Sequence, residues 1–199
     1  MAALVDDLPA SELRFRFSSG RLCLDLVATV GERWQRSFER LRTPQDLGRW
    51  LVEASLLRHA PRVEQSELED ARRLRESIYR MARRAGAGRP EWRDLGELNR
   101  WAAKPPLAPR LGDDGRTVTW VADRPVEAAL ATIARDAVEL LSGPLAARIR
   151  ECAAPDCALM FVDNSRPGKR RWCSMEACGN RVKTAAYRGR RTSRSAKES

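Results

Sequence analysis

Four cysteines within a 27-residue window constrain this chain more than any other feature of its sequence. They form two C-x4-C pairs, Cys152 with Cys157 and Cys173 with Cys178, and fifteen residues separate the pairs. The N-terminus carries acidic residues where a secretory signal carries basic ones, so we expect a chain that stays in the reducing cytoplasm. There, such a pattern indicates a metal site rather than a disulfide framework. We expect the four thiolates to complete the tetrahedral coordination of one structural zinc ion.

Other uses of the cysteines fit this pattern less well. A dithiol redox site favours the spacing C-x-x-C. A catalytic zinc ion needs an open coordination position, and four cysteine ligands leave none. The fifth cysteine, Cys23, lies in an apolar run, so we expect it to be a core side chain.

The residues around the cysteines predict a small treble-clef-like zinc finger, a hairpin followed by a helix. Residues 158–163 are expected to form one strand and residues 170–172 the returning strand. Ser174 is a suitable N-cap for a helix that runs to about Arg191. Since Ser142-Gly143-Pro144 reads as a boundary, we assign the finger to residues 144–199.

Residues 1–143 predict a helical domain with one β-hairpin, so the expected fold class is mainly α. Thr43 and Pro44 are typical of a helix start, and Asp123 is a candidate cap for another helix. Asp113-Asp114-Gly115 marks the turn of the hairpin. The expected helices cover residues 20–34, 44–54, 66–85, 90–103 and 125–141, and the expected strands residues 107–111 and 117–121.

The positive charge of the chain is concentrated in the expected finger. Of the formal net charge of +10, residues 144–199 carry +8, from 13 basic and 5 acidic side chains. This asymmetry is typical of a module that binds a polyanion. The charge distribution by itself fits an alternative equally well, in which the basic residues form a tail that serves only solubility.

The pattern between Phe161 and Lys183 resembles a known family. It reads Phe161-x-Asp163-x-Ser165, then Arg170-Arg171-Trp172-Cys173-Ser174-Met175, then Cys178-Gly179-Asn180-Arg181. These residues resemble the CGNR zinc finger, named for its last cysteine and the three residues that follow it. The segments Gly20-Arg21-Leu22-Cys23-Leu24-Asp25-Leu26 and Thr43-Pro44-x-Asp46-Leu47-x-x-Trp50-Leu51 resemble the ABATE domain that usually precedes this finger. The chain departs from the family pattern at Ala28, where many members carry Asn.

The resemblance implies a stress-induced transcription regulator with a DNA-binding finger and a larger sensing domain. On the expected C-terminal helix, one stripe of side chains would face DNA, and basic residues beside it would grip the phosphates. For Asn180 and Arg181, bracing of the zinc loop is an equal alternative. The candidate DNA contacts are Arg170, Arg171, Asn180, Arg181, Lys183, Thr184, Tyr187, Arg188 and Arg191. We expect Val182, Ala185, Ala186 and Gly189 to pack on the hairpin instead.

The larger domain offers little that is typical of an enzyme. With a single histidine and no Gly-rich phosphate loop, we expect no catalytic activity. Asp25 is a carboxylate in an apolar stretch, so Asp25 and Arg21 are speculative contacts for a small-molecule effector. An ion pair between these two residues, or a contact with a helix N-terminus, explains Asp25 equally well.

Two classes of function therefore remain open. The first is a DNA-binding transcription regulator with an effector-sensing or dimerisation domain, which acts as a homodimer if one finger gives too little specificity. The second is a zinc-finger adaptor that binds RNA or a protein partner. No apolar run is long enough to span a membrane, so we expect no membrane partner.

Overall fold

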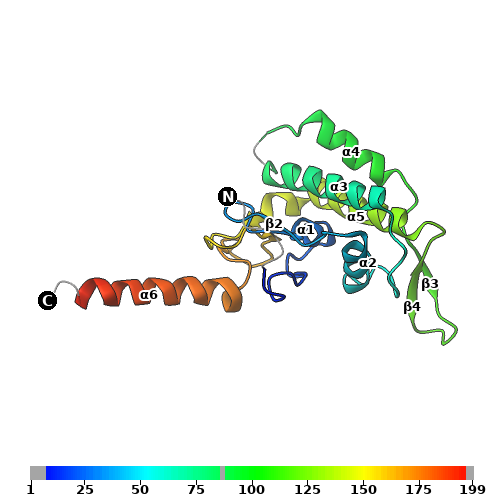
Figure 1. The fold of residues 1–199 in the computed structure, drawn as a ribbon. Coiled ribbons are helices and arrows are strands. Elements are labelled where there is room, and N and C mark those ends of the chain that lie inside the picture. Colours follow the sequence, from blue (N-terminus) through cyan, green and yellow to red (C-terminus); the bar gives the residue numbers. More distant parts are fainter. Residues whose placement is uncertain (1–7, 86–87, 196–199) are drawn as a thin grey trace.

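The computed structural model describes residues 8–85 and 88–195, with the backbone alone for residues 186 and 189–195. Its described part is mainly α-helical with small antiparallel hairpins, as predicted (Figure 1). The helices are α1 (Leu22–Val27), α2 (Pro44–Glu53), α3 (Gln65–Arg83), α4 (Trp92–Ala102), α5 (Pro125–Ser142) and α6 (Asn180–Ser195). The strand pairs are β1 (Val30–Gly31) with β2 (Phe38–Glu39), β3 (Ala108–Leu111) with β4 (Val118–Val121), and β5 (Ile149–Glu151) with β6 (Met160–Val162). A 3-10 turn (Pro144–Arg148) precedes β5, and a π-helical turn (Met175–Gly179) precedes α6.

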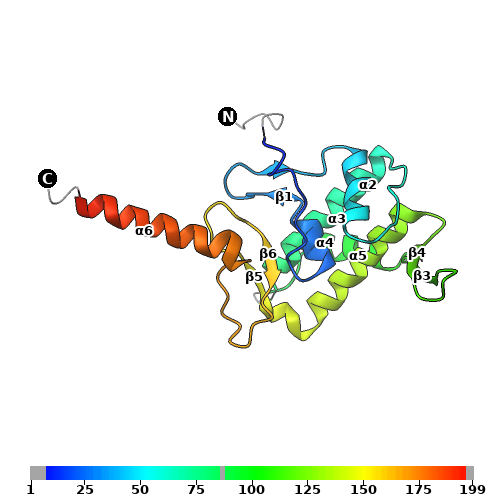
Figure 2. The same ribbon diagram turned by 90° about the horizontal axis from the view of Figure 1, so that it is seen from below.

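Helices α3 and α5 form the centre of the N-terminal body. They lie next to each other, with α4 packed on both from one side and α1 from the other (Figures 1 and 2). Apolar residues at helical spacing, such as Leu68, Leu74 and Ile78 of α3, are fully buried in the shared core. Helix α2 starts as predicted: the Thr43 hydroxyl accepts from the Asp46 amide, and the Asp46 carboxylate accepts from the Thr43 amide.

Two local predictions for this body are wrong. The helix expected over residues 20–34 ends at Val27, because the chain turns there to form β1 and β2. Glu32 and Ser37 adopt positive φ angles in the connection between these strands, a conformation that no helix accommodates. The N-cap of α5 is Arg124 rather than Asp123, and no side chain caps that helix end.

The predicted hairpin of the finger is also corrected by the structure. β6 pairs with β5, which precedes the first cysteine pair, and not with residues 170–172. The ladder continues into the turn, where the Cys152 amide donates to the Leu159 carbonyl at 3.0 Å. The Arg170 amide donates instead to the Asp163 carboxylate at 2.8 Å. A side chain therefore takes the hydrogen bond that a returning strand would need.

The hairpin of β5 and β6 joins the finger to the body. Ile149, Met160 and Val162 belong to the same hydrophobic core as the N-terminal helices. The Val162 amide also donates to the Ser19 carbonyl at 2.8 Å. The finger is thus packed on the body rather than linked to it by a free tether.

Helix α6 extends away from the rest of the molecule (Figures 1 and 2). Among the side chains of α6 that are described, only Val182 near its start packs against the cysteine cluster, and Ala185 is exposed. The prediction that Ala185 would pack on the hairpin is therefore wrong. Ala186 and Gly189, expected on the same stripe, lie outside the residues whose side chains are described.

The close approach of Phe38 to Gly31 predicts a sharp difference between two glycines. A Cβ on Gly31 in β1 would overlap the Phe38 ring, whereas a Cβ on Gly96 in α4 would meet nothing within 4 Å. We expect Gly31→Ala to lower the free energy of unfolding by about 1–3 kcal/mol. The control, Gly96→Ala, should raise it by about 1 kcal/mol because Ala favours a helix interior. Urea unfolding measures both; equal effects of the two substitutions would contradict the packing described for Gly31.

Candidate metal centre and nucleic-acid surface

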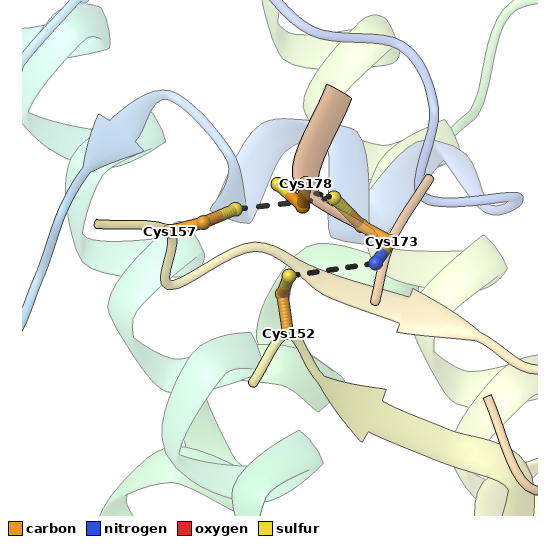
Figure 3. Close-up of side chains that lie close together, drawn as sticks. All are labelled: Cys152, Cys157, Cys173 and Cys178. Carbon is orange, nitrogen blue, oxygen red and sulfur yellow. Dashed lines mark hydrogen bonds between the residues drawn. The ribbon is translucent and has the colours of Figure 1, made fainter. Parts of the chain in front are cut away.

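The four predicted zinc ligands converge on one point (Figure 3). The Sγ atoms of Cys152, Cys157, Cys173 and Cys178 all lie within 4.8 Å of one another. The Sγ atom of Cys173 is 3.9 Å from that of Cys157 and 3.6 Å from that of Cys178. A tetrahedral zinc ion with Zn–S bonds of about 2.3 Å requires sulfur pairs about 3.8 Å apart. These residues therefore fit a zinc ion, which would serve there as a structural cross-link.

Two short segments present the sulfurs. Cys152 follows β5 and Cys157 closes a turn in which its amide donates to the Ala154 carbonyl. Cys173 precedes Ser174, whose hydroxyl caps the next turn by accepting from the Ala177 amide at 3.2 Å. Cys178 lies inside that π-helical turn. A tight knuckle and a helix start thus each supply one pair, as the sequence spacing predicted.

The surroundings of the sulfurs favour bound metal over free thiols. Burial, and next the charge of Cys157, raise the pKa of Cys178, and a bound cation would favour its thiolate form. The Cys173 amide donates to the Cys152 sulfur at 3.4 Å, and the Arg181 guanidinium to the Cys178 sulfur at 3.5 Å. These donors would stabilise the negative charge of a zinc–tetrathiolate centre.

The N-terminal body also reaches the centre. Arg16 donates to the Cys157 sulfur at 3.9 Å, and Ala28 of the body packs in the cysteine cluster. Arg40 is buried nearby and donates to the carbonyls of Ala28 and Glu12. Burial lowers the pKa of Arg40 to about 10, which leaves it charged at neutral pH. No local pattern marks Arg16 or Arg40 in the sequence, since Arg is frequent along the whole chain.

Asp163 organises the loop that leads to the second cysteine pair. It is buried, and its carboxylate accepts from the amides of Ser165 and Arg170. The side chain of Ser165, and after it the amides of Arg170 and Ser165, lower the pKa of Asp163 to about 2. The sequence placed Asp163 in a motif but did not reveal this role.

The candidate DNA contacts differ in their surroundings. Arg181 donates to Asp156 at 2.8 Å as well as to Cys178, so it braces the zinc loop. Arg170 donates to the Cys173 carbonyl at 2.5 Å and lies over the Phe161 ring. Arg171 lies over the Trp172 ring. The remaining described candidates, Asn180, Lys183, Thr184, Tyr187 and Arg188, are exposed on α6, whereas the side chain of Arg191 lies outside the described residues.

The two speculative effector contacts, Arg21 and Asp25, have different partners in the structure. Arg21 pairs with Asp136 of α5 at 2.8 Å rather than with Asp25. The other Asp136 oxygen accepts from the Cys23 amide at 2.8 Å, so α5 supplies the cap for the start of α1. The Asp25 carboxylate accepts from the Ser19 amide at 3.1 Å. Sequence reasoning missed Asp136, which lies among the apolar residues of α5.

Comparison with protein-family models gives two matches. Residues 20–144 match the ABATE model, described as "Putative stress-induced transcription regulator", and residues 148–191 match the CGNR zinc finger model. A search of curated proteins gave no match. None of the helices that the structure describes has both the length and the apolar character of a membrane span.

The convergence of the four sulfurs predicts one zinc ion per chain. Cys157→Ser should abolish stoichiometric zinc binding, because three thiolates and a hydroxyl hold the metal far more weakly. Cys23 is equally buried but belongs to the core of the body, so Cys23→Ala is the matched control and should keep its zinc. Elemental analysis of the purified variants measures this; zinc retained by Cys157→Ser would contradict the assignment.

Asp25 predicts a pH dependence of stability. Burial raises its pKa from 3.8 to about 6 although the Ser19 hydrogen bond lowers it. Between these values the folded chain binds more protons than the unfolded chain, so the wild type loses stability as pH rises from about 4 to 6. Asp25→Asn has no carboxyl group to titrate and so avoids this loss. At pH 7 its free energy of unfolding should be about 1–3 kcal/mol higher than that of the wild type.

The measurement for Asp25 is the difference in unfolding free energy between variant and wild type, followed by urea unfolding across pH. Taking the difference cancels the titration of the zinc ligands, which both proteins share. The difference should be near zero at about pH 4 and level off above about pH 7. A difference that is constant over this range would show that Asp25 is not a buried, perturbed carboxyl.

Proposed function

Because the chain belongs to the ABATE family and carries a CGNR zinc finger, we propose that it is a transcription regulator that binds duplex DNA through α6. The observation that carries this proposal is the basic helix that extends from the finger and whose described side chains after Val182 are exposed. Residues 180–195 include six basic and no acidic residues. An α-helix of this kind fits the major groove, and Arg and Lys side chains pair with phosphates and guanine edges.

The exposure of α6 supports a partner of opposite charge. Most helices in proteins owe their stability to an apolar face packed on a core. Beyond Val182, the described side chains of α6 are exposed and include Lys183 and Arg188. Neutralisation of the basic side chains by phosphates would stabilise the helix in place of packing.

The metal centre would make DNA binding depend on zinc. Cys178 lies in the turn that leads into α6, and Cys157 lies in the knuckle on the hairpin. Without metal, the Arg181–Asp156 ion pair would be one of few described contacts that orient α6 relative to the knuckle. An exposed ion pair contributes about 0–1 kcal/mol, so it cannot replace the metal.

The body takes the sensing role in this proposal. It contacts the finger through the shared core and through Arg16 at the Cys157 sulfur. A cavity of about 360 Å³ lies at this junction, between the β1–β2 hairpin and the knuckle that carries Cys157. An effector that changes the body could therefore alter the position of the finger without a flexible linker between them.

The test is binding of the full-length, zinc-loaded protein to a fluorescent DNA duplex over a range of salt concentrations. Lys183→Gln/Arg188→Gln should weaken binding and lower the slope of log K against log salt by about 2, one unit per lost phosphate contact. Arg62→Gln/Arg93→Gln removes the same charge from exposed positions on the body and should leave binding unchanged.

Three results would contradict the proposal. Binding that does not change with salt would exclude phosphate recognition. Equal losses in the two double variants would mean that total charge, and not α6, determines affinity. Tighter binding to structured RNA than to duplex DNA would favour the RNA-binding adaptor instead.

A further inference from the structure

Cys157 differs from the other three cysteines of the metal centre because it lines a cavity. This is the cavity of about 360 Å³ between the β1–β2 hairpin and the knuckle, and none of the other three cysteines belongs to its described wall. The exposed fraction of the whole residue does not separate the four, since it is between 1% and 6% for each. A solute as small as hydrogen peroxide can therefore approach Cys157 through the cavity.

Arg16, also in the cavity wall, brings positive charge to the Cys157 sulfur. A guanidinium nitrogen of Arg16 lies 3.9 Å from that sulfur. The carboxylates of the described wall are paired with other arginines: Glu12 and Glu32 with Arg36, and Asp156 with Arg181. A cation in this position stabilises negative charge that develops beside the sulfur, such as that of a departing hydroxide ion.

Hydrogen-bond donors lie closer to two of the other sulfurs. The Cys152 sulfur accepts from the Cys173 amide at 3.4 Å, and the Cys178 sulfur from Arg181 at 3.5 Å. A donor that stabilises a thiolate also makes it a weaker nucleophile. Access and nucleophilicity therefore both favour Cys157 as the first sulfur to react.

Cys173 is placed to complete an oxidation that starts at Cys157. Their Sγ atoms are 3.9 Å apart (Figure 3). The two cysteines come from different segments, since Cys157 belongs to the knuckle and Cys173 precedes the turn that leads into α6. A bond between them would thus join the two halves of the metal centre directly.

We propose that hydrogen peroxide oxidises Cys157, which then forms a disulfide with Cys173, and that zinc is released as a result. The Cys157 thiolate attacks one peroxide oxygen, the O–O bond breaks, and a sulfenic acid and a hydroxide ion form. The Cys173 thiolate then attacks the Cys157 sulfur, forms the S–S bond and expels a second hydroxide ion. Two thiolates have then lost two electrons, and one peroxide has been reduced to two hydroxide ions.

The oxidised centre would bind zinc weakly. Only Cys152 and Cys178 remain as thiolates, too few for the tetrahedral set that a structural zinc ion needs. Reduction of the disulfide in the presence of zinc would restore the centre. This reactivity goes beyond the proposed DNA binding and does not rest on it, because sulfur and zinc alone define it.

The experiment treats the full-length, zinc-loaded protein with hydrogen peroxide in the absence of DNA. A zinc-sensitive dye follows release of the metal, and mass spectrometry maps disulfides and the sulfenic acids that dimedone traps. The wild type should release its zinc, with the first sulfenic acid on Cys157 and the first disulfide between Cys157 and Cys173. Dithiothreitol with added zinc should reverse the change.

Two histidine variants form a matched pair, because three cysteines and one histidine also hold structural zinc. Cys157→His should release zinc about tenfold more slowly than the wild type, since no oxidisable sulfur then lines the cavity. Cys152→His replaces a sulfur outside the cavity and should keep about the wild-type rate. Arg16→Gln should slow release about threefold, whereas Arg62→Gln on the surface of the body should not.

Three results would overturn the proposal: a first oxidation product that excludes Cys157, equal rates of zinc release from the two histidine variants, or zinc retained by the wild type in excess peroxide. Equal rates for the two arginine variants would overturn the role of Arg16. If a histidine variant fails to bind zinc, the map of oxidised cysteines in the wild type decides by itself. None of these outcomes bears on DNA binding, which is measured separately.

Discussion

The alternation of side chains along β6 is the constraint that connects the two halves of the molecule. Successive side chains of a strand point to opposite faces. Met160 and Val162 therefore enter the core of the helical body, whereas Phe161 packs in the cluster that contains the four cysteines. A short strand of three residues thus serves two cores at once. A shift of one residue in register would turn the apolar pair toward the metal centre and separate finger and body.

The zinc centre would strengthen the attachment of α6 to the rest of the molecule, which few of the described side chains support by packing. The hairpin is fixed to the body by buried apolar residues and by the Val162–Ser19 hydrogen bond. Among the described side chains of α6, Val182 makes the apolar attachment, together with Trp172 just before the helix. The position of α6 therefore depends on the sulfurs at its base. This arrangement separates stability, which resides in the body, from the orientation of the basic helix, which depends on the metal.

Much of the fold and of the metal centre followed from sequence patterns that act locally. The start of α2 was predictable because Thr43, Pro44 and Asp46 form a cap within one turn. The four ligands were predictable because zinc chemistry dictates both residue type and spacing. By contrast, the partner of β6 was not predictable from periodicity. Two segments could pair with it, and the buried Asp163 carboxylate decided the outcome by taking the Arg170 amide.

Other contacts escaped prediction because they join residues far apart in sequence. Arg21 was read together with Asp25, four residues away, yet it pairs with Asp136. The packing of α1 against α5, and not the spacing in the sequence, determines which carboxylate pairs with Arg21. The same reasoning applies to Arg16 and Arg40, whose closeness to the metal centre appears only when the body and finger pack together.

The body buries its apolar side chains well, and the two projecting elements depart from that rule in opposite ways. The described side chains of α6 expose mainly polar and charged groups, whereas β4 exposes apolar side chains and carries no charge. A charged helix without a packed face gains stability from a polyanion, and an open uncharged strand edge gains it from another strand. The two surfaces therefore differ in the chemistry that a partner of each would need.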